Sequence, residues 1–127
     1  MAHKQSATQI RRIEELQQFV RTVDKVKKLI AELESNRAAK LSIINGICGN
    51  IARELSSMRQ RALTANLGAV PDVAGSLAVV AGRAGTGIMM RVRALHDGMN
   101  SLTMQLDQSL KMAHEAPPEK DEETDKS

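Results

Sequence analysis

Aromatic residues are almost missing from the sequence, whose 127 residues include one Phe and no Trp or Tyr. Aromatic rings form the stacking surfaces of proteins that bind single-stranded nucleic acid, and they build methyl-lysine cages and most carbohydrate and flavin pockets. The composition therefore argues against each of these functions.

Cysteine is equally scarce, because the sequence contains only Cys48. A single cysteine excludes an internal disulfide framework and any zinc site made of several cysteines, and it favours a reducing compartment. Residues 1–9 hold no apolar run that would indicate a signal peptide. Residues 73–90 are apolar but include Arg83 and four Gly, so we expect no membrane span. These features together predict a cytoplasmic protein.

The residue sets that carry catalysis are also lacking. His3, His96 and His114 share no metal-ligand spacing, and no serine lies in a turn of the kind that exposes a nucleophile. The glycines of residues 82–87 follow the order G-x-x-G-x-G, and Ile88 stands where a phosphate-binding loop needs a lysine. We therefore expect no enzyme activity, no metal, no cofactor and no small-molecule substrate.

Charge is divided unevenly along the chain, although the formal net charge is only +3. Residues 1–66 hold 12 Lys/Arg and 6 Asp/Glu, residues 67–113 hold 4 and 3, and residues 114–127 hold 2 and 6. A basic body of +7 thus precedes an acidic segment of −4. Because residues 114–127 have almost no apolar surface to bury, they are predicted to be a disordered acidic tail, and residues 1–9 a flexible N-terminus.

Apolar residues recur every three or four positions over most of the remaining chain, and this spacing is typical of amphipathic helices. The expected helices cover about residues 10–33, 38–66, 71–82 and 88–113. The heptad register runs unbroken through residues 34–37, so a single helix over residues 10–66 stays open as an alternative. Asn66-Leu67-Gly68 followed by Pro71 predicts a helix end and a new start.

The apolar face of the first helix covers heptad positions a, d and g, which is wider than the seam of a two-stranded coiled coil. The predicted fold is therefore all-α, either an antiparallel helical bundle or a long helical hairpin with coiled-coil-like heptad packing. Residues 10–113 form the helical domain in both cases. Cys48 falls at a core position, where a small buried thiol is expected.

Two functions compete at this point. The first is a non-enzymatic structural or adaptor subunit that assembles with a protein partner, or with itself as a homo-oligomer, through apolar helix faces. Methionine is flexible and polarisable, and exposed groups of it form adaptable protein interfaces. The residues predicted at such an interface are Phe19, Val26, Leu33, Met89, Met90 and Met104.

The alternative is a small basic protein that binds nucleic acid, or a ribonucleoprotein subunit, making phosphate contacts independent of sequence. Its support is a stripe of basic residues at helical spacing on the side away from the apolar face. The predicted phosphate-binding residues are Arg11, Arg21, Lys25, Lys28 and Arg53. We favour the assembly function, because an ordinary solvated helix produces the same charge pattern, whereas wide apolar faces must be buried.

Overall fold

The computed structural model describes residues 6–83 and 87–115, and these residues form four α-helices and no strand. In chain order the helices are α1 (Ala7–Ser35), α2 (Leu41–Thr64), α3 (Val70–Gly82) and α4 (Ile88–Glu115). The predicted all-α fold is confirmed.

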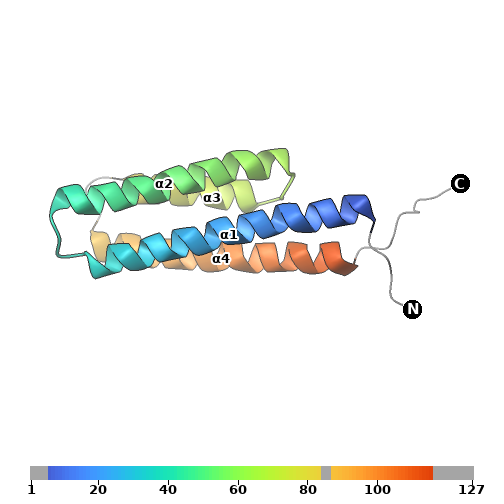
Figure 1. Ribbon diagram of the computed structural model, residues 1–127. Helices are drawn as coiled ribbons and strands as arrows, with labels where there is room; N and C mark the ends of the chain where they lie inside the picture. Colours follow the sequence, from blue (N-terminus) through green and yellow to red (C-terminus); the bar gives the residue numbers. More distant parts are fainter. Residues whose placement is uncertain (1–5, 84–86, 116–127) are drawn as a thin grey trace, which may run out of the picture.

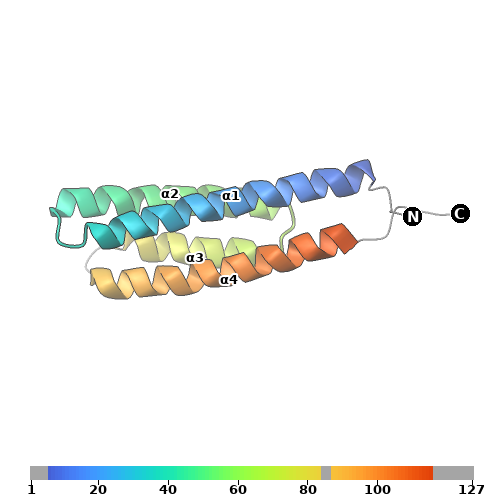
Figure 2. The ribbon, with the colours of Figure 1, turned by 60° about the horizontal axis from the view of Figure 1, so that its bottom comes forward.

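The four helices form an antiparallel bundle in which each helix packs against two others (Figure 1). Both α1 and α3 pack against α2 and α4, while the diagonal pairs α1–α3 and α2–α4 make no contact in the described residues. Each helix runs opposite to the one before it (Figure 2). The structure is thus the bundle, and the long hairpin is wrong.

The first connection shows that residues 10–66 are two helices. At the end of α1 the Asn36 side-chain amide donates to the Glu32 carbonyl at 2.8 Å, and the backbone N–H of Ala39 donates to the Asn36 carbonyl at 2.8 Å. Asn36 therefore closes α1 and begins a tight turn. The heptad register continues through this turn because both helices bury their faces in the same core.

The connection from α2 to α3 is a Schellman turn. Asn66 has a positive φ of 57°, and the N–H of Leu67 donates to the Ala62 carbonyl at 3.1 Å, which satisfies an orphan carbonyl at the helix end. Gly68 also has a positive φ, of 58°, before Pro71 and Asp72 occupy the first turn of α3. These are the residues that predicted the helix end and restart.

Two expected boundaries were wrong by a few residues. The segment predicted as a flexible N-terminus reaches into α1, which begins at Ala7, and His114 and Glu115, predicted as tail, belong to α4. The rest of the predicted acidic tail, residues 116–127, lies outside the described residues, as do residues 1–5 and 84–86.

The core is built from aliphatic side chains, methionine and alanine contributed by all four helices. Leu16, Ile30, Leu55, Met58 and Leu102 are among its fully buried members. Cys48 is buried, as its heptad position predicted. Because the chain has only one Phe, the core is filled mainly by aliphatic side chains and methionine at heptad spacing.

Among the described glycines, Gly98 of α4 leaves the least room for a side chain. A β-carbon added there would lie only 2.2 Å from Cδ2 of Leu77 on α3. Leu77 is itself buried, so its side chain occupies the space that the missing β-carbon leaves. The sequence pattern did not identify Gly98.

Candidate functional site

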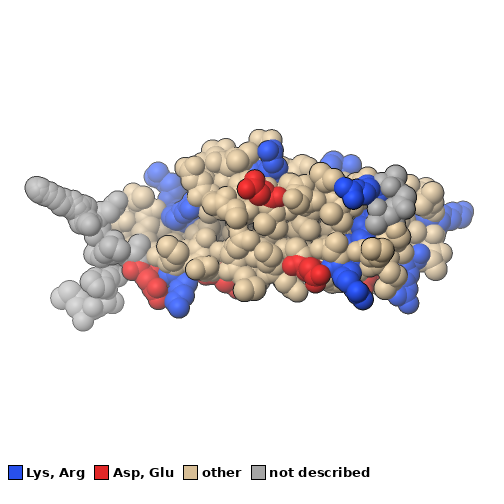
Figure 3. Space-filling view, turned by 180° about the vertical axis from the view of Figure 1, so that it is seen from behind, with Lys and Arg blue, Asp and Glu red and all other residues tan. Residues whose placement is uncertain are grey.

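Positive charge gathers at the end of the bundle where α1 ends and α4 begins. This basic end comprises residues 27–48, 80–83 and 87–97, with seven Lys/Arg against three Asp/Glu, a net charge of +4. The seven are Lys27, Lys28, Arg37, Lys40, Arg83, Arg91 and Arg93. Figure 3 shows Lys and Arg side chains clustered over this end.

Two helix N-termini lie at the basic end, because α2 and α4 both begin there (Figure 1). Neither helix has an acidic residue in its first turn, and the N-cap of α2, Lys40, makes no side-chain capping hydrogen bond. At the other end of the bundle, Ser6 caps α1 and Asp72 lies in the first turn of α3. Because α1 and α3 end where α2 and α4 begin, the helix dipoles largely cancel, and the positive potential of the basic end comes from its side chains.

Large apolar side chains are exposed at the same end. Leu41 and Ile43, in the first turn of α2, are 70% and 47% exposed, and Met89 and Met90, in the first turn of α4, are 53% and 73% exposed. A group of exposed apolar side chains at one end of a small bundle is a candidate surface for binding a partner. Leu41 falls at a heptad core position, yet it is exposed because α2 begins beyond the level at which its neighbours cover it (Figure 1).

An open hollow lies beside Met89 and Met90. Its walls are Glu34 of α1 and the outward residues of the first turns of α4, including Arg93 and Asp97. The Arg37 guanidinium donates to Sδ of Met89 at 3.5 Å, and Nε2 of His96 lies 2.8 Å from a Glu34 carboxylate oxygen. The hollow is therefore apolar at its centre and charged at its rim.

A buried arginine supports the basic end from inside. Arg91 is 6% exposed; its Nη1 donates to Cys48 Sγ at 3.1 Å and its Nη2 to the Arg83 carbonyl at 2.5 Å. These bonds tie the start of α4 to α2 and to the end of α3. The sequence analysis missed Arg91, which stands beside the core residue Val92 and reaches the interior only because Cys48 opposite it is small.

The six predicted interface residues divide into two groups. Phe19, Val26 and Leu33 are buried in the core, so the bundle's own helices cover the edge of α1 that was expected to bind another protein. Phe19 is also covered by the Arg61 guanidinium, 5.3 Å from its ring centre. The prediction of an interface at these three residues does not fit this placement, whereas Met89, Met90 and Met104 are exposed, with Met104 on the side of α4.

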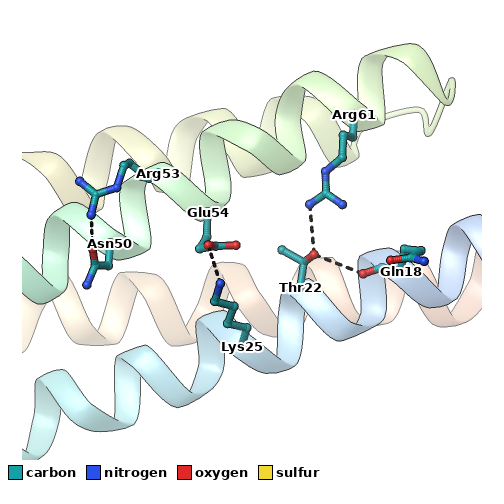
Figure 4. Close-up of polar contacts among 7 residues, drawn as sticks. All are labelled: Gln18, Thr22, Lys25, Asn50, Arg53, Glu54 and Arg61. Atoms are coloured by element: carbon teal, nitrogen blue, oxygen red, sulfur yellow. Dashed lines mark hydrogen bonds and ion pairs between the residues drawn. The ribbon is translucent and has the colours of Figure 1, made fainter.

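The predicted phosphate-binding residues are all exposed, on α1 and α2. Figure 4 shows the middle of this surface, where Lys25 Nζ lies 2.8 Å from a Glu54 carboxylate oxygen and Arg53 is hydrogen-bonded to Asn50. Arg21 and Lys28 lie seven residues apart on α1, about 10 Å along the helix. Arg11 lies nearer the start of α1, three residues before Glu14. Part of the stripe's charge is thus already paired within the bundle.

The part of the chain that the structure describes holds no metal-binding cluster. No group of three or more His, Cys, Asp or Glu residues is placed to hold a metal ion there. None of the four helices has both the length and the apolar character needed to cross a membrane. Comparison with protein-family models, with curated proteins and with solved structures gave no match. The functional argument therefore rests on the surface of the bundle itself.

Proposed function

We propose that the protein is a non-enzymatic helical subunit of the cytoplasm that assembles with other protein chains through the basic end of its bundle. The single observation that carries this proposal is the exposure of Met89 and Met90 beside the hollow, with Leu41 and Ile43 also exposed at the start of α2 at the same end. A protein partner would remove these side chains from water. At roughly 25 cal/mol per Å² of apolar surface, a few such side chains contribute several kcal/mol to association.

Charge selects among partners for this end. A net charge of +4 favours a partner surface with carboxylates and disfavours a second basic end. The nucleic-acid alternative remains a prediction for the stripe on α1 and α2. It is second in rank because Lys25 is already paired with Glu54 and because phosphate binding gives no role to the exposed apolar residues.

Site-specific photocrosslinking in cells that make the protein tests this proposal. A crosslinking amino acid replaces Met90, and the matched control replaces Gln17, an exposed residue in the middle of α1. We expect one recurrent crosslinked protein at position 90, lost when Leu41 and Met89 are changed to Ser. If position 90 gives no more crosslinking than position 17, the proposed function is wrong.

A further inference from the structure

The end of the bundle opposite the basic end carries no excess of positive charge. Residues 6–16, 60–72 and 105–115 hold four Lys/Arg and five Asp/Glu, a net charge of −1. The two ends of the described bundle therefore differ strongly in net charge, with +4 at one end and −1 at the other.

The opposite end also exposes large apolar side chains. Ile10 of α1, Leu63 of α2 and Met112 of α4 are exposed there. With the four at the basic end, seven of the nine exposed large apolar residues in the described chain lie at the two ends, and only Val79 and Met104 lie elsewhere. The sides of the bundle are thus mostly polar, while both ends are apolar in part.

The shapes of the two ends also match. At the opposite end α1 and α4 extend beyond the turn that joins α2 to α3, which leaves a step (Figures 1 and 2). This step exists because Arg12 of α1 already donates to the Ala65 carbonyl in that turn, so the earlier residues of α1 have no α2 beside them. At the basic end, α2 extends furthest and carries Leu41 and Ile43 in its projecting turn.

We infer that the occupant of the basic end is a second copy of this chain, docked head to tail, with the first turn of α2 seated in the step beside Ile10 and Met112. This inference rests on the proposed function and names its partner. A symmetric contact between two basic ends would place +4 against +4, whereas the head-to-tail contact places +4 against −1. Such a contact uses different surfaces on the two copies, so it leaves one free end of each kind and continues into a chain of copies.

Two variants and their mixture test the inference with purified protein. The basic-end variant carries Leu41→Glu and Met90→Glu, and the opposite-end variant carries Ile10→Lys and Met112→Lys. The matched control, Val79→Glu with Met104→Lys, makes the same kinds of change on the sides of the bundle. All six side chains are exposed, so folding is preserved and is checked by far-UV circular dichroism.

Sedimentation velocity and light scattering measure the outcome. We expect the mass of the unmodified chain and of the control to rise with concentration at about 20 mM salt and to rise less at about 0.5 M salt. Each end variant alone is expected to associate at least about tenfold more weakly. An equimolar mixture of the two variants is expected to form a dimer, because each supplies the intact end that the other lacks.

Three results would overturn the inference: an unmodified chain that stays monomeric at every concentration, an opposite-end variant that associates as well as the unmodified chain, or a mixture that forms no dimer. A different crosslinked protein at position 90, together with a monomeric purified chain, would reject self-assembly and leave the proposed function standing.

Discussion

Replacing Gly98 by Ala tests whether the contact between α3 and α4 depends on a missing side chain. The added β-carbon would lie 2.2, 2.7 and 2.8 Å from Cδ2, Cδ1 and Cγ of Leu77. Carbon atoms in ordinary contact are about 3.5–4.0 Å apart, so the whole branched end of Leu77 must move. Leu77 is buried and has little room to do so.

The magnitude follows from two opposing terms. Alanine in place of glycine inside a helix gains about 1 kcal/mol in helix propensity. Forcing an extra carbon into a packed core costs about 1–3 kcal/mol. Gly46→Ala is the matched control, because Gly46 lies within α2 and a β-carbon there meets no atom within 4 Å. The two substitutions share the propensity gain, so Gly98→Ala is expected to be about 1–3 kcal/mol less stable than Gly46→Ala.

Urea unfolding followed by circular dichroism measures both variants, since the chain has no Trp or Tyr for fluorescence. A double-mutant cycle adds a second readout. Leu77→Ala alone is expected to cost about 2–5 kcal/mol through the cavity it leaves, and less in the Gly98→Ala background, where the new methyl group occupies part of that space. If Gly98→Ala stabilises the protein as much as Gly46→Ala does, the packing argument is refuted.

Three further predictions concern the other features of the bundle. Arg91→Ala is expected to lower the free energy of unfolding by about 1–3 kcal/mol, because it removes the hydrogen bonds to Cys48 and Arg83. The control Arg93→Ala, on the surface, is expected to change it by less than about 0.5 kcal/mol. Equal effects of the two substitutions would contradict the buried role of Arg91. Asn66→Gly is expected to raise thermal stability and Asn66→Ala to lower it by about 1 kcal/mol, since the positive φ of 57° suits glycine; calorimetry showing the reverse order would count against the turn geometry. If the stripe binds phosphates, Arg21→Glu with Lys28→Glu abolishes retention on DNA or RNA at low salt, and a chain that is not retained before substitution ends the nucleic-acid alternative.

The sequence predicted the helices well because their signals are local. Apolar residues that recur every three or four positions mark α1 and α4, and Asn66, Gly68 and Pro71 mark the turn between α2 and α3. The sequence left open whether residues 10–66 form one helix or two. A heptad pattern that continues in phase is compatible with one straight helix and with two helices that share one core.

The candidate site was harder to predict, since exposure depends on which helices lie side by side. Phe19 and Val26 look like an unpartnered edge when α1 is considered alone, but α2 and α4 enclose α1 in the bundle. Leu41 shows the opposite case. Its heptad position indicates burial, but its place at the start of α2 leaves it exposed. Of the six predicted interface residues, only Met89, Met90 and Met104 are exposed, as an interface requires.

The pairing of α1 with α4 has a consequence for how the chain acquires its structure during synthesis. Gln9 on α1 donates to the Ala113 carbonyl on α4 at 2.8 Å. Residues about a hundred positions apart in the sequence must therefore meet before α1 and α4 can pack together. The α2–α3 hairpin needs only a short loop to close, whereas the side of α1 that faces α4 stays in contact with water until α4 has been synthesised. A nascent chain stalled before residue 88 would therefore display an uncovered apolar strip along α1, which makes this helix the natural target for a chaperone.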